Sequence, residues 1–300
     1  MNNQKHYAAA ITAFVVWGFF SIPLRALKAY SAGEILYFRI LLSALVLLVV
    51  VSLFKRADVK SNWQRFQELT GTQRRKVALL TLAGGALLSV NWLSFIYIVN
   101  NINIKTASFS YLICPVFTAV LGYAIIQEKL SRLQWSAVGL CALSCVLIGM
   151  QSAFELGYSF FTAFTYALYL ITQRINQGFD RLVMLFIQVL FSLLILTVFF
   201  TQLVHQVPAE GNFYLIILLI AVMFTVLPLF LNLFALNKIN SATIGILMYI
   251  NPLINFTLAF VVFHESITPL QVMGYGVIAV ALVLFNYPNL RKIQTALRPG

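Results

Sequence analysis

The stretch NNINIKTASFSYLICPVFTAVLGYAIIQE at residues 100–128 returns as NKINSATIGILMYINPLINFTLAFVVFHE at residues 237–265, without a gap and 137 positions later. The two stretches share polar and helix-bending residues at equal spacing: Asn100 and Asn237, Asn103 and Asn240, Thr106 and Thr243, Pro115 and Pro252, Glu128 and Glu265. Shared hydrophobicity would align apolar residues alone, so this match predicts an internal structural repeat.

The repeat extends beyond this stretch in both directions. Later in the chain Gly139 matches Gly276 at the same offset, and earlier segments fit better at an offset of 149 residues. The second offset pairs Arg25 with Arg174 and Ser43 with Ser192. The long segment 55–76, whose counterpart 204–211 is short, accounts for the change of offset. We therefore expect one repeat over residues 1–151 and a second over residues 152–300.

The composition indicates a membrane protein. Of 300 residues, 61% are hydrophobic and 9% are charged, and the mean hydropathy is +0.91, whereas soluble domains carry about a quarter charged residues. A membrane-spanning helix needs about 20 mostly apolar residues. Ten such segments follow one another: 7–27, 33–54, 77–99, 104–127, 132–151, 154–175, 181–203, 212–236, 240–263 and 268–288. The predicted fold class is an all-α integral membrane protein with ten transmembrane helices.

The basic residues support this count. Ten spans put both termini on one side, and 16 of the 20 Lys and Arg residues fall on that side, seven of them in segment 55–76. The opposite loops hold only Lys28 and Lys105. By the positive-inside rule, both termini are cytoplasmic. The net charge of +12 is thus explained by basic residues on the cytoplasmic side of a membrane protein. Nucleic acid is therefore not an expected partner.

Five helices per repeat is an odd number, so the second repeat is expected to be inverted in the bilayer. The charges agree, because segment 55–76 is strongly basic and its counterpart 204–211 has no Lys or Arg. Inverted repeats are typical of secondary transporters, which hold the substrate near the midplane and expose it to each side in turn. This symmetry favours a small-molecule permease over a channel or a structural protein.

Short motifs in the first repeat carry a resemblance to a known family. In order they are Trp17-Gly18 before Pro23, Glu34-Ile35-Leu36-x-x-Arg39, Asn91-Trp92-Leu93-x-Phe95-Ile96, Val99-Asn100-Asn101, Ala107-Ser108-x-x-Tyr111 and Pro115. This order, with the Pro-x12-Glu spacing that ends at Glu128, resembles the RarD-type permeases of the EamA family in the drug/metabolite transporter superfamily. The resemblance covers nearly the whole chain. It implies transport of a small metabolite or drug, often export, across the bacterial inner membrane, and it names no ligand.

The sequence departs from that family pattern at two places. Ser21 and Ile22 precede Pro23, and Asn251 precedes Pro252 where a glycine is expected. Both departures lie beside helix prolines, so either could alter the shape of the central cavity.

Arg39 is the clearest candidate for binding substrate. It lies within the second predicted helix, where a charge is expensive and commonly functional. One interpretation is an anchor for an anionic or carboxylate group on the substrate path. The alternatives are a structural ion pair with Glu34, five residues earlier, and a side chain that extends to the interface.

Aromatic and amide residues supply the other substrate-binding candidates. They are Asn91, Trp92, Tyr111, Asn232, Tyr249 and Asn251, with Trp17 as a weaker candidate. An aromatic face with an amide suits a neutral or zwitterionic organic solute. Hydrogen bonding between helices is the competing explanation for each of them.

Four prolines are candidate hinges: Pro23, Pro115, Pro228 and Pro252. Each lacks an N–H and so frees the carbonyl four residues earlier, which are those of Phe19, Tyr111, Phe224 and Met248. The matched pair Pro115 and Pro252 predicts symmetric hinges for gating. A simple kink, with the carbonyl satisfied by neighbours, is the alternative.

Glu128 and Glu265 end the fourth and ninth predicted helices on opposite membrane faces. Proton coupling is one interpretation, and a hydrogen bond at a helix end is the other. The glycines predicted to allow close helix packing are Gly84, Gly85, Gly122, Gly139, Gly274 and Gly276. The three cysteines, Cys114, Cys141 and Cys145, are expected to be buried apolar residues.

No catalytic constellation, Walker-type glycine loop or metal-ligand cluster is apparent, so neither an enzyme nor a cofactor is expected. The expected partners are a small-molecule substrate and membrane lipid, and homodimerisation stays open. The remaining alternative is a polytopic membrane protein that binds a partner or has a structural role and transports nothing.

Overall fold

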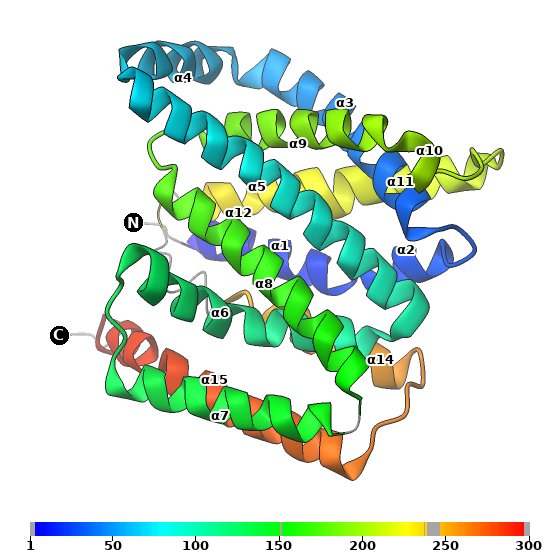
Figure 1. Ribbon diagram of the computed structural model, residues 1–300, viewed down its shortest axis with the longest axis vertical. Helices are drawn as coiled ribbons and strands as arrows, with labels where there is room; N and C mark the ends of the chain where they lie inside the picture. The colour runs from blue at the N-terminus through cyan, green and yellow to red at the C-terminus, as the bar shows by residue number, and fades with distance from the viewer. Residues whose placement is uncertain (1–3, 151, 237, 239–246, 297–300) are drawn as a thin grey trace.

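The computed structural model describes residues 4–150, 152–236, 238 and 247–296, and within them the chain is helical with no strand. The long helices lie side by side in one bundle and run back and forth between its two ends (Figure 1). The matched residues Asn237, Asn240 and Thr243 lie outside the described residues.

The first half of the chain contains α1 (Gln4–Gly18), α2 (Ser21–Ala26), α3 (Ala32–Phe54), α4 (Arg56–Glu68), α5 (Gly71–Tyr97), the π-helical turn η1 (Ile98–Ile102), α6 (Ile104–Ile126) and α7 (Arg132–Gly149). The second half contains α8 (Ala153–Ile175), α9 (Arg181–Val198), α10 (Phe200–Leu203), α11 (Gly211–Ala221), the π-helical turn η2 (Val222–Val226), α12 (Leu227–Leu236), α14 (Ile250–Val261) and α15 (Pro269–Ala296).

Seven helices of the described part are long and apolar enough to cross a membrane, and two shorter apolar helices, Arg132–Ile148 and Ile250–Val261, accompany them. The protein is therefore a multi-pass membrane protein. Helix α8 falls outside the seven although it has 23 residues. Its Thr and Tyr residues lower its hydropathy, and several of them point into the bundle, as Thr162 and Thr165 do.

Segment 55–76, which lies between the second and third predicted membrane spans, is mostly helical. It forms the separate helix α4 and the first turns of α5, and α4 has no buried side chain. Trp63 is 60% exposed and stacks on Phe66. A basic helix with exposed aromatic residues suits the membrane interface. Helix α4 also contacts the turn before α9, where Asn62 Oδ1 accepts from the Asp180 N–H at 2.9 Å and Arg65 lies over the Phe179 ring.

Helix starts follow local hydrogen-bonding rules. Ser31, Thr70 and Ser131 each form a capping box with the Glu or Gln three residues later. The first predicted helix divides into α1 and α2 at Phe19 and Phe20, whose N–H groups donate to carbonyls three residues earlier, those of Val16 and Trp17. Pro23 has no N–H to donate to the Phe19 carbonyl, so the regular helical pattern is interrupted here.

Two helix ends share an unusual backbone geometry. Gln127 after α6 has φ 57° and His264 after α14 has φ 50°, and they are the non-glycine residues with left-handed backbone in the described chain. In each case the next residue donates its N–H back into the helix, from Glu128 to the Gly122 carbonyl at 3.1 Å and from Glu265 to the Ala259 carbonyl at 2.9 Å. These are αL helix caps. Their three positions correspond at the offset of 137, although only the Glu is the same residue in both.

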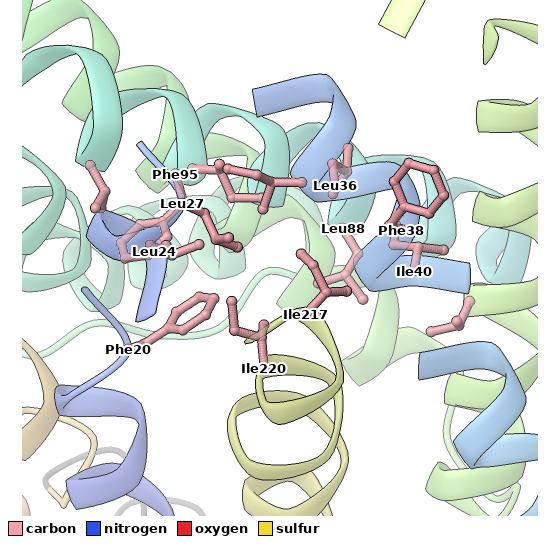
Figure 2. Packing of buried hydrophobic residues seen from close by; sticks show 14 of the residues in the cluster. Phe20, Leu24, Leu27, Leu36, Phe38, Ile40, Leu88, Phe95, Ile217 and Ile220 are labelled. Atoms are coloured by element: carbon pink, nitrogen blue, oxygen red, sulfur yellow. The ribbon is translucent and has the colours of Figure 1, made fainter. Parts of the chain in front are cut away.

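Helices from the two halves pack against one another. Helix α3 packs on α9, α7 on α15, and α6 on α14. Helix α1 packs on α12, and α5 packs on α8. The largest apolar cluster joins α2, α3, α5 and α11, where Figure 2 shows Phe20, Leu24, Leu36, Leu88, Ile217 and Ile220 among others. Large apolar side chains such as Phe54, Leu194 and Val198 are exposed outside the bundle, as lipid contact requires.

Glycines allow the closest helix approaches. A Cβ on Gly85 of α5 would lie 2.8 Å from the Gln188 carbonyl oxygen of α9, and Ser192 donates to the Gly85 carbonyl at 3.0 Å. Gly84, Gly122 and Gly274 are also in close contact with neighbours. The prediction was wrong for Gly139 and Gly276, since nothing lies within 4 Å of a Cβ built there.

Gly85→Ala is expected to destabilise the protein by about 2 kcal/mol, because the α9 backbone would have to move. Gly139→Ala is the matched control and is expected to be neutral or to stabilise by up to about 1 kcal/mol through helix propensity. Thermal unfolding of both purified variants in detergent measures the difference. Equal unfolding temperatures for the two variants would contradict the close α5–α9 approach.

Candidate functional site

Arg39 lies fully inside the bundle on α3, with 2% of its surface exposed. Its guanidinium carbon lies 4.7 Å from the ring centroid of Phe20 and 4.6 Å from that of Trp92. Its Nε donates to Thr225 Oγ1 at 3.2 Å, and its Nη1 has no hydrogen-bond partner among the described residues. A guanidinium between two aromatic faces gains cation–π energy of up to about 2 kcal/mol each when desolvated.

Glu34 does not pair with Arg39, so the predicted ion pair is wrong. Glu34 accepts from the Ser31 N–H at 2.9 Å and forms the capping box of α3. Its other oxygen accepts from the Gln206 N–H at 3.4 Å. Five residues on a helix turn the side chain by about 140° and move it about 7.5 Å along the axis, so the two groups face different neighbours.

Asn91 and Tyr111 join three helices. Tyr111 Oη on α6 donates to Asn91 Oδ1 on α5 at 3.1 Å. Asn91 Nδ2 donates to the Thr162 carbonyl at 2.8 Å and to Thr165 Oγ1 at 3.3 Å, both on α8. Asn91 is completely buried, and its acceptor and donor are both used. In this conformation its contacts are those of a hydrogen bond between helices.

An aromatic wall surrounds this pair. The Phe95 and Tyr111 ring centroids lie 5.3 Å apart, and those of Tyr111 and Tyr166 lie 5.5 Å apart. Phe20, which covers one face of Arg39, stacks on Phe95 at 5.8 Å. Arg39, Trp92 and Tyr111 thus belong to one aromatic cluster, with Phe20, Phe95 and Tyr166, between α2, α3, α5, α6 and α8.

Trp17 lies at the edge of the same aromatic cluster. Its Nε1 donates to the Phe224 carbonyl at 3.0 Å. That carbonyl is the one expected to be freed by Pro228, the second residue of α12. The Phe224 ring in turn stacks on Phe20 at 5.5 Å. The side chain of Trp17 therefore satisfies a backbone group that the proline leaves without a helical donor.

The other three candidates lie elsewhere in the second half. Asn232 is half-buried in α12. Tyr249 precedes α14 and packs against a separate apolar cluster that contains Phe109 and Cys114. Asn251 Oδ1 accepts from Asn255 Nδ2 at 2.7 Å. No hydrogen bond among the described residues joins these candidates to Arg39 or Asn91.

Asn255, which the sequence analysis missed, links the two departures from the family pattern. Its Oδ1 accepts from Ser21 Oγ of α2, and its Nδ2 donates to Asn251. The chain Ser21–Asn255–Asn251 holds α2 against α14. Only a helical plot of α14, which places Asn251 and Asn255 on one face, could have indicated it beforehand.

The prolines have unequal surroundings. Pro115 lies inside the continuous helix α6, whereas Pro252 is the third residue of α14, where a missing N–H is tolerated. The Met248 carbonyl accepts from Asn251 N at 3.3 Å, and the Phe19 carbonyl before Pro23 accepts from Ile22 N at 3.1 Å. The proposal of symmetric hinges at Pro115 and Pro252 stays a prediction.

Two ion pairs join the halves at opposite ends of the bundle. Arg25 of α2 pairs with Glu265, which follows α14, at 3.0 Å. Arg174 of α8 pairs with Glu128, which follows α6, at 2.6 Å and 2.8 Å. In Figure 1, α2 and the end of α14 lie at the right, and the ends of α6 and α8 lie at the left.

The two pairs differ in burial. The Arg25 and Glu265 side chains are 18% and 11% exposed, against 43% and 45% for Arg174 and Glu128. Glu265 also accepts from the backbone N–H groups of Ile104 and Lys105 at 2.7 and 3.0 Å, where the start of α6 favours a negative charge. The bundle is therefore held more tightly at the Arg25 end.

Lys105 belongs to this closure and not to an exposed loop as its sequence position suggested. It is 8% exposed, and its Nζ donates to the Ser266 carbonyl at 2.7 Å. At the other end, Lys55 lies 2.9 Å from both Asp58 and Asp180 and ties α3 to α9. The hydrogen bond to Asp58 raises the pKa of Lys55, with a further contribution from Asp180.

Cys114, Cys141 and Cys145 are free and buried, as the sequence predicted. No group of three or more His, Cys, Asp or Glu residues in the described chain could hold a metal ion.

Comparison with known proteins identifies the class. The sequence profile of the EamA-like transporter family matches residues 4–150 and 154–287, so the chain belongs to this family and is a membrane transporter. An uncharacterized transporter of Vibrio cholerae is 30% identical over 98% of this chain and 96% of its own.

Protein RarD of Streptomyces exfoliatus is 30% identical over 94% of this chain and 88% of its own. The uncharacterized transporter YojE of Bacillus subtilis is 28% identical over 96% and 95%. These relatives agree with the resemblance to RarD-type permeases. One solved crystal structure covers 95% of this chain and 98% of its own with a TM-score of 0.61 at 11% identity, which supports the fold alone.

Glu265→Ala is expected to lower the free energy of unfolding by about 3 kcal/mol, because it leaves Arg25 and two buried N–H groups without an acceptor. Glu128→Ala is the matched control, and removal of its exposed pair is expected to cost about 1 kcal/mol or less. Thermal unfolding in detergent compares them. A control that is destabilised as strongly as Glu265→Ala would refute the asymmetry between the two ends.

Proposed function

We propose that this protein is a secondary permease that exports a small organic solute across the bacterial inner membrane by alternating access. In this proposal the chain forms ten transmembrane helices in two inverted five-helix repeats, residues 1–151 and 152–300. Both termini are cytoplasmic, and the substrate binds at the aromatic cluster around Arg39.

Several features of the fold support the two repeats. The helix caps at Gln127 and His264 match at the offset of 137, and the family profile matches residues 4–150 and 154–287 separately. The packing pairs also support a twofold relation. Corresponding helices pack on each other in the pairs α3 with α9, α6 with α14 and α7 with α15, and the contact of α1 with α12 has its counterpart in that of α5 with α8.

The two ion pairs carry the proposal of alternating access. Arg25 corresponds to Arg174 at the offset of 149, and Glu265 corresponds to Glu128 at the offset of 137. Each pair therefore joins one residue of each repeat, and the twofold relation exchanges the two pairs. When inverted repeats exchange conformations, one end opens as the other closes. The pairs Arg25–Glu265 and Arg174–Glu128 are suited to hold the two ends closed in turn.

Orientation and direction are supported by the sequence. The basic helix α4, the start of α1 and the end of α15 lie at the same end of the bundle as the end of α6 (Figure 1), which the positive-inside rule assigns to the cytoplasm. The Arg25–Glu265 pair then closes the outer side. Export follows from the resemblance to RarD-type permeases.

Counterflow in proteoliposomes tests the function, with a pooled amino-acid and drug library and with or without a proton gradient. We expect saturable flux for the wild type and a loss of about tenfold or more in Glu265→Gln and in Arg174→Gln, because either change raises the barrier to closing one end. Asp58→Asn, which alters an exposed pair at the end of α3, is the matched control and should keep normal flux.

Absence of flux for every solute, from protein that unfolds cooperatively, would refute the permease. Normal flux in both ion-pair variants would leave transport standing and refute the closure by these pairs. Outward flux that is not favoured over inward flux in vesicles of known orientation would refute export.

A further inference from the structure

We propose that the substrate is an organic monoanion whose carboxylate binds Arg39 between Phe20 and Trp92, and whose body is aromatic or apolar. This inference rests on the proposed transport function and names the class of solute. The observation that supports it is the buried guanidinium of Arg39, which has no acidic side chain beside it.

All eight acidic residues of the chain are accounted for away from Arg39. Glu128 and Glu265 pair with arginines, and Asp58 and Asp180 pair with Lys55. The other four are Glu34 in its capping box, Glu155 with Thr106 Oγ1 at 2.8 Å, Glu210 with Tyr30 Oη at 3.0 Å, and Glu68 on the exposed helix α4. No side chain of the protein can neutralise Arg39, so its counter-charge has to come from a bound molecule.

The position of the guanidinium is already fixed for such a molecule. Phe20 and Trp92 hold its two faces, and Nε is held by Thr225. The Thr225 hydroxyl donates to the Ile220 carbonyl at 3.1 Å and so presents a lone pair to Arg39. This contact comes from the π-helical turn η2, a distortion that often marks functional sites. The edge with Nη1 is left free, and a planar guanidinium edge is suited to a carboxylate.

The number of charges favours a monoanion over a phosphate. At the offset of 149 the counterpart of Arg39 is Gln188 of α9, a neutral residue that is 1% exposed. Of the two corresponding buried residues, Arg39 therefore carries a positive charge and Gln188 carries none. A dianionic phosphate would need a second cation, whereas a single carboxylate is neutralised by Arg39 alone.

The surroundings indicate the body of the solute. Phe95, Tyr111, Tyr166 and Tyr169 follow one another with centroid distances of 5.3, 5.5 and 5.8 Å. Phe20 connects this row to Arg39 (Figure 2 shows Phe20 and Phe95 in the buried cluster). A row of rings leading from one cation binds planar or apolar groups through stacking and contact.

Matched triplets of probes test the class of solute. Each triplet has one body with a carboxylate, an amide or a cationic group: benzoate, benzamide and benzamidine; indole-3-acetate, indole-3-acetamide and tryptamine; hexanoate, hexanamide and hexylamine. Ligand-induced thermal stabilisation of the full chain in nanodiscs gives the apparent Kd of each. We expect at least one carboxylate to bind the wild type more tightly than both matched partners.

Arg39→Gln is expected to weaken that carboxylate roughly 100-fold and to leave the amide unchanged, since a buried charge pair is lost. Arg39→Lys keeps the charge but loses the planar stacking, and we expect an intermediate loss of roughly tenfold. It also keeps the test valid should Arg39→Gln fail to fold. Arg56→Gln on the exposed helix α4 is the matched arginine control and should bind as the wild type does.

The proposal is overturned if no carboxylate stabilises the wild type more than its amide, or if Arg39→Lys binds the carboxylate as well as the wild type. Because the readout is binding, it separates this inference from the transport function. Carboxylate binding without flux would refute the permease alone, and flux with no preference for a carboxylate would refute the anion site alone.

Discussion

A charge inside hydrocarbon has to find its partner within the protein, because no water is present to solvate it. The helix arrangement follows this constraint at several points. Arg25 meets Glu265 across the halves, and Lys105 turns inward to the Ser266 carbonyl. Arg39 is the exception, because its partners are the aromatic faces of Phe20 and Trp92 and a single hydroxyl. Arg39 is therefore a buried charge whose contacts in the described chain include no acid.

Helix α2 lies between the aromatic cluster around Arg39 and the Arg25–Glu265 end of the bundle. Phe20 covers Arg39 and lies in the turn between α1 and α2, and Arg25 lies in the last turn of α2. The polar chain from Ser21 through Asn255 to Asn251 fastens α2 to α14, whose end leads to Glu265. A movement of α2 would thus alter the aromatic contact with Arg39 and the Arg25–Glu265 closure together. This short helix thus connects the surroundings of Arg39 to the Arg25–Glu265 pair.

The sequence predicted the helical class, the burial of the three cysteines, and most helix positions, because each depends on local hydropathy. It failed where the partner lies far along the chain. Glu34 was the nearest acid in sequence to Arg39, yet it caps its own helix. Lys105 looked exposed because it begins a helix, and its partners at Ser266 and Gln271 come from the other half. Helix α4 was not expected because its charges lower the hydropathy that marks a membrane span.

What the sequence determined by itself is the repetition of the Pro and Glu motifs, the apolar segments and the uneven distribution of basic residues between alternate loops. These are properties of single positions and their spacing, which lipid selects without reference to the rest of the fold. Only the tertiary structure decided that Arg25 pairs with Glu265 and Arg174 with Glu128, and that Arg39 has aromatic faces in place of an acid. The reason is physical: hydrogen bonds, ion pairs and ring contacts depend on distances of a few ångströms between helices, which no local pattern specifies.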